Sequence, residues 1–245
     1  MSFYPVFLRE LIVFKRRLFR KSYFISTLFT PVLYLLTFGL SLGRRIQMEG
    51  VSYLEFLIPG LISFASANES FKWNAMSVSL GRIYYKTFEE YLVSPVSFSS
   101  IMIGYCLSGC IKGLFSSFMI MLVAIFFGYP PPADPLFYVV LLLNCILFSS
   151  LGTVAGILAK SYNDVFVFSN FFIAPMTFLC GTFFSVKRFP DWIKTIIFYL
   201  PLTQTSLALR ASFLKKEFPL YSIPILFAFT VFFYFLGLFL LRRKS

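Results

Sequence analysis

Apolar residues run along most of the chain in long uninterrupted stretches, and short polar segments between them carry most of the charges. Six stretches are long enough to cross about 30 Å of hydrocarbon as helices, at about 1.5 Å per residue. The stretches do not alternate with period two, so helices are predicted and a barrel is excluded. The predicted spans are 23–42, 55–78, 99–127, 135–158, 165–185 and 220–241.

Residues 3–21 form a basic amphipathic stretch before the first span. One helical stripe is apolar and consists of Phe7, Leu11, Phe14 and Leu18, with most of the arginines opposite. This pattern predicts a helix lying in the membrane interface with its apolar face down. The alternative is a basic flank of the first span.

Residues 186–219 interrupt the pattern between the fifth and sixth spans. Two short apolar stretches meet at Pro201, and the second carries Gln204 and Arg210. Neither half is long enough to span, so a re-entrant or interfacial helical hairpin on the outer face is predicted. A seventh span here would instead place the C-terminus outside.

Composition agrees with a membrane protein, because 58% of the 245 residues are apolar and only 13% are charged. We therefore expect one all-α polytopic domain over 1–245. Lys and Arg number 22 against 10 Asp and Glu, an excess that suits anionic headgroups better than nucleic acid. Both termini are expected in the cytoplasm, since this orientation puts twelve basic residues inside and eight outside.

The residue types exclude several kinds of chemistry. The chain has no His, and its four Cys lie within apolar runs, where small apolar packing suits them better than a disulfide or a metal site. No phosphate-binding loop is present, so no nucleotide or metal cofactor is expected in this chain. Small residues spaced four apart at Gly104/Ser108, Gly109/Gly113 and Gly152/Gly156 indicate faces for close helix packing.

Three ionisable residues lie inside predicted spans, where charge is costly. Glu69 and Lys72 stand three apart on the second span, and Lys112 lies near the middle of the third. They could line a translocation path or a dimer seam. Alternatively, Glu69 and Lys72 form an internal pair and Lys112 meets a carbonyl or Glu69; we favour a structural role for Lys112.

The cytoplasmic segment 82–94 is predicted to form a short amphipathic helix that ends at Ser94 and Pro95. Tyr84, Phe88 and Leu92 recur every four residues with Tyr91 beside them, while Lys86, Glu89 and Glu90 face away. A simple connection would not need this aromatic stripe. It favours docking to a partner or to the membrane surface.

The run from Tyr85 to Ser97 resembles the cytoplasmic motif of type-2 ABC transporter permeases, which include exporters of nodulation factors, lipid-linked polysaccharides and drugs. Asn68-Glu-Ser-Phe71 is similar to the nodulation-factor branch. Gly181–Ser185 running into Phe189–Trp192, and Leu200–Thr203 followed by Leu209-Arg210, carry further resemblance. Gln204 stands where many members have His.

The resemblance implies a permease subunit in a bacterial or archaeal cytoplasmic membrane. Two copies, or a copy and a close paralogue, would form the path for a lipidic, glycolipid, polysaccharide or drug-like amphiphile. Two copies of a separate ATPase would bind ATP and Mg and push on the cytoplasmic loops. The implied ATPase-coupling residues are Tyr84, Tyr85, Phe88, Glu89, Glu90, Tyr91 and Leu92.

Two other functions remain open from the residues themselves. A secondary transporter would use Glu69, Lys72 and Lys112 for ion coupling, although no matching pair of broken helices accompanies them. A membrane-embedded transferase or protease would need clustered acids, His or an activated Ser, and the ten acids here are mostly scattered.

Overall fold

The computed structural model describes residues 3–19, 29, 32–37, 47–87, 90–91, 94, 96–184, 186 and 190–244, and almost all of its regular structure is helical. The long helices are α3 (Tyr53–Ile83), α5 (Phe98–Phe126), α6 (Pro135–Leu158) and α11 (Ser222–Lys244). The shorter ones are α1 (Tyr4–Leu18), α7 (Tyr162–Phe168), the π-helical turn η1 (Ser169–Ile173), α8 (Ala174–Leu179), α9 (Asp191–Phe198) and α10 (Pro201–Phe213). A small antiparallel hairpin of β1 (Gln47–Met48) and β2 (Val51–Ser52) precedes α3.

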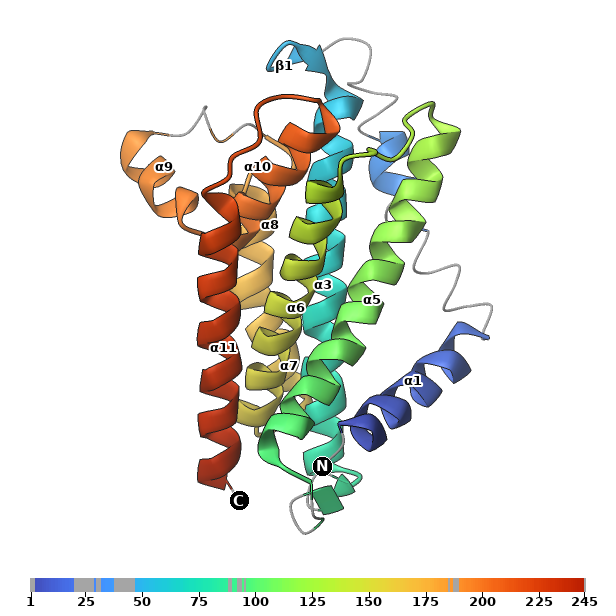
Figure 1. The fold of residues 1–245 in the computed structure, drawn as a ribbon, viewed down its shortest axis with the longest axis vertical. Coiled ribbons are helices and arrows are strands. Elements are labelled where there is room, and N and C mark those ends of the chain that lie inside the picture. Colours follow the sequence, from blue (N-terminus) through green and yellow to red (C-terminus); the bar gives the residue numbers. More distant parts are fainter. Residues whose placement is uncertain are drawn as a thin grey trace.

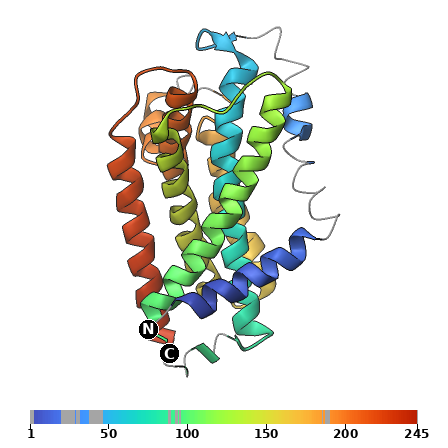
Figure 2. The same cartoon turned by 45° about the vertical axis from the view of Figure 1, so that its right-hand side comes forward.

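The long helices run side by side as a bundle, with α3 packed most extensively against α6 and α5 (Figure 1). The continuous helix α7–η1–α8 adds a further member. At one end of the bundle lie α9 and α10, and at the other α1 lies obliquely against α5 (Figures 1 and 2). The described part of α1 and the C-terminal end of α11 therefore occupy the same end of the molecule.

Most predicted helices are present near their predicted bounds, which confirms the all-α class. Spans 99–127, 135–158 and 220–241 correspond to α5, α6 and α11, which among the described residues are the three helices long and apolar enough to cross a membrane. Span 55–78 lies within α3, and span 165–185 begins in α7. Of 23–42 only 29 and 32–37 are described, so the count of six spans remains a prediction.

Local sequence signals explain where the helices begin. The Asp134 carboxylate accepts a hydrogen bond from the Leu136 amide at 3.0 Å, and Pro135 takes the first helical position of α6. Ser97 accepts from the Ser100 amide at the start of α5. Pro201 ends the turn after α9 and begins α10, so two short helices occupy the predicted hairpin segment. Whether they re-enter the membrane remains a prediction.

Small residues bring the central helices into contact, as their spacing predicts. A Cβ atom built on Gly152 of α6 would lie 2.9 Å from the Phe71 Cα of α3, and one on Gly156 would lie 2.8 Å from the Ala75 carbonyl oxygen. On α5, a Cβ atom on Gly104 would lie 2.8 Å from the Val6 Cβ of α1. Alanine does not fit at these positions without movement of a neighbouring helix.

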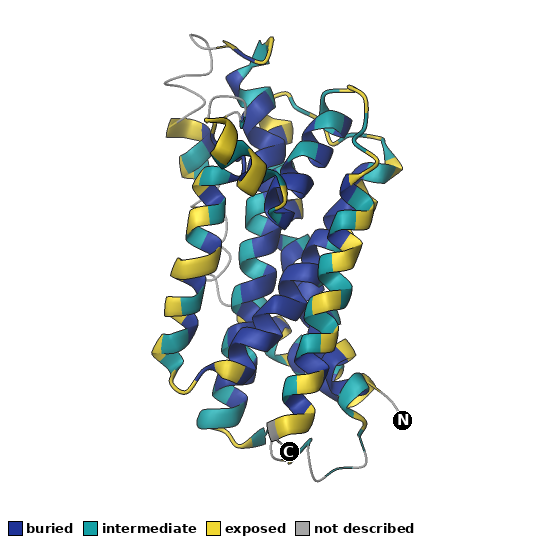
Figure 3. Cartoon of the chain, turned by 90° about the vertical axis from the view of Figure 1, so that its left-hand side faces the viewer, coloured by how far each residue is buried: buried dark blue, intermediate teal, exposed yellow. Residues whose placement is uncertain are grey.

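The outer surface of the bundle exposes large aromatic side chains, which a soluble protein would bury. Figure 3 shows buried residues gathered along the middle of the bundle and exposed residues on its outer faces. The exposed aromatic residues of η1, α8 and α11 include Phe171, Phe178, Phe227, Phe232, Phe235 and Phe239. Such an apolar exterior fits hydrocarbon as the surrounding solvent.

Candidate functional site

The loop that leaves α3 exposes two tyrosines at the end of the bundle where α1 lies. Tyr84 and Tyr85 are 65% and 64% exposed. Glu90 is exposed and Tyr91 is half-buried. The other three residues expected to couple to an ATPase, Phe88, Glu89 and Leu92, lie outside the described residues.

The segment 82–94 differs from the single helix that its periodicity predicts. Arg82 and Ile83 belong to the last turn of α3, and Tyr84 is its C-cap. Lys86 has a φ angle of 52°, a left-handed conformation that ends the helix, and Thr87, Glu90 and Tyr91 are helical again. Tyr84 and Tyr91 therefore lie on opposite sides of this break, and a single uninterrupted helix over 82–94 was wrong. The aromatic stripe also depends on Phe88 and Leu92, which lie outside the described residues, so it stays a prediction.

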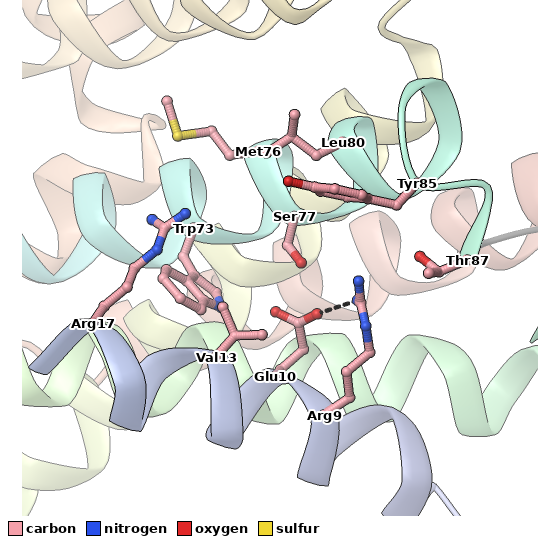
Figure 4. Close-up of a pocket in the computed structure, with 10 residues that line it drawn as sticks. All are labelled: Arg9, Glu10, Val13, Arg17, Trp73, Met76, Ser77, Leu80, Tyr85 and Thr87. Atoms are coloured by element: carbon pink, nitrogen blue, oxygen red, sulfur yellow. Dashed lines mark hydrogen bonds and ion pairs between the residues drawn. The ribbon is translucent and has the colours of Figure 1, made fainter.

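A cavity of about 390 Å³ lies between α1, the C-terminal half of α3 and this loop (Figure 4). Arg9, Glu10 and Arg17 of α1 line one side, facing Trp73 of α3. Tyr85 and Thr87 line it from the loop. The cavity thus connects the amphipathic helix to the segment that we expect to meet an ATPase.

Glu10 is the buried charge of this cavity. Its side chain is 1% exposed, and its Oε1 pairs with the Arg9 Nη1 at 2.8 Å. Burial raises the pKa of Glu10, while the Ser77 hydroxyl, the Arg9 guanidinium and the Trp73 indole act in the opposite direction. Burial also raises the pKa of Tyr91, which the same guanidinium lowers, so the loop and α1 share one electrostatic environment.

The buried face of α1 differs from the predicted stripe. Val6, Glu10 and Phe14 are buried, whereas Leu11 and Leu18 are only half-buried. These three buried residues recur every four positions and meet α3 and α5. Glu10 is the one acid among the first 22 residues and lies at this spacing between two apolar residues, a signal that could have identified it.

Lys112 of α5 is held by aromatic rings. Its side chain is 2% exposed, and its Nζ lies 4.1 Å from the ring centroids of both Phe14 and Trp73. The two rings meet edge-to-face, with centroids 6.0 Å apart. Cation–π attraction is strongest where the cation is desolvated, so this contact ties α1, α3 and α5 together.

Glu69 and Lys72 are half-buried on α3, and no ion pair joins them. The internal pair that their spacing allows is therefore absent between these two described residues. A role for Glu69, Lys72 or Lys112 in a path or dimer seam stays a prediction.

With this geometry in place, comparison with known proteins gives the family. The sequence matches the family described as ABC-2 type transporter over residues 6–214. The chain belongs to this family. It is 31% identical over 228 residues to the inner membrane transport permease YadH of Escherichia coli (strain K12), covering 89% of this chain and 88% of the relative.

Two nodulation proteins give weaker matches. Nodulation protein J of Rhizobium leguminosarum bv. viciae is 29% identical over 195 residues, 78% of this chain and 75% of the relative. Nodulation protein J of Bradyrhizobium diazoefficiens is 27% identical, over 78% of this chain and 74% of the relative. The resemblance to type-2 ABC permeases is therefore confirmed at the level of the family, and the relatives include nodulation proteins.

In this ABC-2 permease, the matched region extends from α1 to just beyond α10 and includes the cavity and the loop.

Inside the bundle, hydrogen bonds from buried asparagines join the helices to one another. The Asn74 amide of α3 donates to the Ser149 hydroxyl at 2.6 Å and to the Thr153 hydroxyl at 3.1 Å, both on α6. The Asn144 amide of α6 donates to the Ser66 hydroxyl of α3 at 2.7 Å. These bonds lie within one chain and fix its helices.

The opposite end of the permease is held by Arg210 and Gln204 of α10. The Arg210 guanidinium donates to the Gly181 carbonyl at 2.7 Å and to the Phe56 carbonyl at 3.2 Å, and it lies 3.6 Å from the Phe56 ring centroid. Gln204 donates to the Phe198 carbonyl and accepts from the Ser222 hydroxyl at 2.9 Å. Gln204 thereby joins α9, α10 and α11.

Proposed function

We propose that this chain is the permease subunit of an ABC exporter in a bacterial inner membrane. A separate ATPase would drive it, and its path would carry a lipidic, glycolipid, polysaccharide or drug-like amphiphile. Membership of the ABC-2 family supports the transporter class, and the name of YadH, an inner membrane transport permease, agrees with transport at the inner membrane.

The observation that carries the ATPase partnership is the exposed pair Tyr84 and Tyr85. Large aromatic side chains at a polar end of a membrane protein are not shielded by hydrocarbon, and exposed aromatic anchors are typical of protein interfaces. The ends of α3 and α5 meet at this loop, so force on it would reach the core of the bundle. Two ATPase copies, with their ATP and Mg, would act on two permease copies.

Pairing of permeases follows from the interior of the bundle. The buried asparagines of α3 and α6, Asn74 and Asn144, make their hydrogen bonds within one chain. A single copy therefore offers little polar wall for a large amphiphile. We propose that the path lies between two copies.

The test is to replace the exposed Tyr84 and the predicted coupling residue Phe88, and to measure both ATPase co-purification and substrate-linked ATP turnover. Burying one aromatic ring stabilises an interface by about 1.5–3 kcal/mol, so Tyr84→Ala and Phe88→Ala should weaken association by about tenfold or more. Glu89→Ala should do less, since rim charges act mainly on association rate.

Tyr199→Ala is the matched control, because Tyr199 is 61% exposed just after α9, at the opposite end. It should leave ATPase association unchanged. Wild-type assembly and turnover in both Tyr84→Ala and Phe88→Ala would reject the coupling role. Ion-driven transport by the permease without any ATPase would favour a secondary transporter instead.

A further inference from the structure

We propose that two copies of this chain meet through the helix α7–η1–α8, with the Asn170 side chains of the two copies hydrogen-bonded to each other. The inference rests on the proposed function, which places the path between two copies. It deepens that function by assigning the face at which the copies meet and the residue at the centre of this face.

One face of α7–η1–α8 is not covered by the described part of the chain. Elsewhere on this helix, α7 packs against α3 and α8 packs against α10. The uncovered face exposes five large apolar residues: Phe166, Val167, Phe171, Phe172 and Phe178. Lipid or a second protein surface would suit these residues equally well, so they do not by themselves identify what covers the face.

Asn170 is the polar exception in the middle of this face. It is exposed in the π-helical turn η1, directly before Phe171 and Phe172. It follows Tyr162, the first residue of α7, by eight positions and precedes Leu179, the last residue of α8, by nine. At about 1.5 Å per residue, its position is about 12 Å or more from either end of the helix. The amide therefore lies within the hydrocarbon, which is about 30 Å thick.

The other helices of the bundle show no such residue on their outer faces. Between their terminal turns, the described residues of α5, α6 and α11 expose only apolar side chains, and α3 has no exposed residue. Inside the bundle, the Asn74 and Asn144 amides bond to neighbouring helices. No hydrogen bond joins the Asn170 side chain to another described residue. Since an unpaired amide in hydrocarbon costs free energy, Asn170 indicates a partner outside this chain.

A second copy of the chain supplies a partner whose groups match. A carboxamide has an oxygen that accepts and an NH₂ group that donates, so two Asn170 amides facing each other can exchange two hydrogen bonds. A two-fold axis brings a residue against its own counterpart, which is the arrangement that this exchange needs. Side-chain amides join membrane helices in this way, whereas lipid tails offer them neither donor nor acceptor.

Aromatic rings around Asn170 give the two copies apolar surface to pack. The rings of Phe168 and Phe172 stack with their centroids 6.4 Å apart, and the ring of Phe171 meets that of Phe172 edge-to-face at 5.5 Å. Packing of these rings against the second copy would keep lipid away from the paired amides. The amides therefore fix which residues meet, and the rings supply the buried area.

Crosslinking of the full chain in membranes by copper phenanthroline, in a background without the native cysteines, tests the contact. Val167→Cys lies on the proposed face and leaves Asn170 in place. We expect it to form disulfide-linked dimers, and to form far fewer when Asn170→Leu is added. Phe232→Cys is the matched control, because Phe232 is 58% exposed near the middle of α11 and Val167 is 64% exposed. It should form no dimer.

The dissociation constant of the dimer measures the contribution of the amide. Energy transfer between fluorescently labelled copies, diluted into lipid vesicles, should show association about tenfold weaker for Asn170→Leu, the effect of losing two hydrogen bonds between membrane helices. Asn170→Gln keeps the donor and the acceptor and should restore most of the affinity. Asn163→Leu is the control, because Asn163 is exposed in the first turn of α7, at the end of the helix. It should leave the affinity unchanged.

Unchanged affinity in Asn170→Leu would overturn the proposal, and if transport were lost at the same time the amide would be assigned to substrate contact. Dimers from Phe232→Cys but not from Val167→Cys would also overturn it. In that case two copies still pair, through α11, and the path between copies proposed above would stand. A chain that stays monomeric with Asn170 intact would reject the pairing itself. Neither assay contains an ATPase, so both outcomes leave the coupling role to its own test.

Discussion

Arg210 illustrates how one side chain can hold three segments together. Its guanidinium joins the carbonyls of Phe56 and Gly181 while lying over the Phe56 ring. A lysine ammonium has no planar fork, so Arg210→Lys can satisfy at most part of this arrangement. We expect a loss of about 2 kcal/mol in the free energy of unfolding and a fall of about 5 °C in melting temperature.

Thermal unfolding in detergent measures this effect, with Arg16→Lys as the control because Arg16 is exposed on α1. A melting temperature equal to that of the unmodified protein in Arg210→Lys would mean that charge alone is enough at this position.

At the residue scale, the sequence predicted that Lys112 is buried in a helix but did not predict all the side chains that surround it. Lys112 was expected to meet a carbonyl or Glu69; it does interact electrostatically with Glu69, but the contact of its Nζ with the rings of Phe14 and Trp73 was not foreseen. These residues are far apart in the sequence, and periodicity within one element carries no information about which elements meet. The same limit hid the cavity, which exists only where α1 crosses α3.

At the scale of elements, the contact of α6 with α3 depends on glycine. A methyl group on Gly152 would collide with the backbone of Phe71, including its carbonyl oxygen. Backbone atoms within a helix cannot move aside as a side chain can. Gly152→Ala should therefore destabilise the bundle by about 1–3 kcal/mol, as overpacking does. Melting temperature and the fraction recovered as monodisperse protein are the measurements.

Gly237→Ala provides the matched control on α11. A methyl group there would come within 2.5 Å of the Met102 Cε, the flexible end of a side chain that can turn away. This change should be close to neutral. Equal losses from both substitutions would show that helix propensity, rather than helix contact, governs the response.

Element bounds were foreseen well because apolar runs and caps are local. The start of α6 follows from Asp134 and Pro135, and the start of α10 from Pro201. The loop after α3 was foreseen less well. Its break comes from the positive φ of Lys86, a conformation that no preference of lysine predicts.

For the whole molecule, the decisive prediction is topology. The described start of α1 and the end of α11 lie at one end of the bundle, and α9 lies at the other (Figure 1). We expect Ser2→Cys and Ser245→Cys to react with an impermeant maleimide only from the cytoplasmic side, and Lys194→Cys to react from outside in intact cells.

The labelling requires a background without the native cysteines, all four of which are free and buried. Their replacement by alanine or serine should first be checked for retained assembly. Reaction of Lys194→Cys from the cytoplasmic side alone would reject the external position of the segment 186–219.

The hydrogen bonds of Asn74 have a consequence for biosynthesis. Its partner Ser149 follows 75 residues later in the chain. At a synthesis rate of about 5–20 residues per second, α3 waits about 4–15 s for α6 to emerge from the ribosome. During that interval its polar stripe faces lipid or the insertion machinery without its final partners. Nascent chains arrested between α3 and α6 should therefore remain crosslinked to the translocon, and Asn74→Leu should release them earlier.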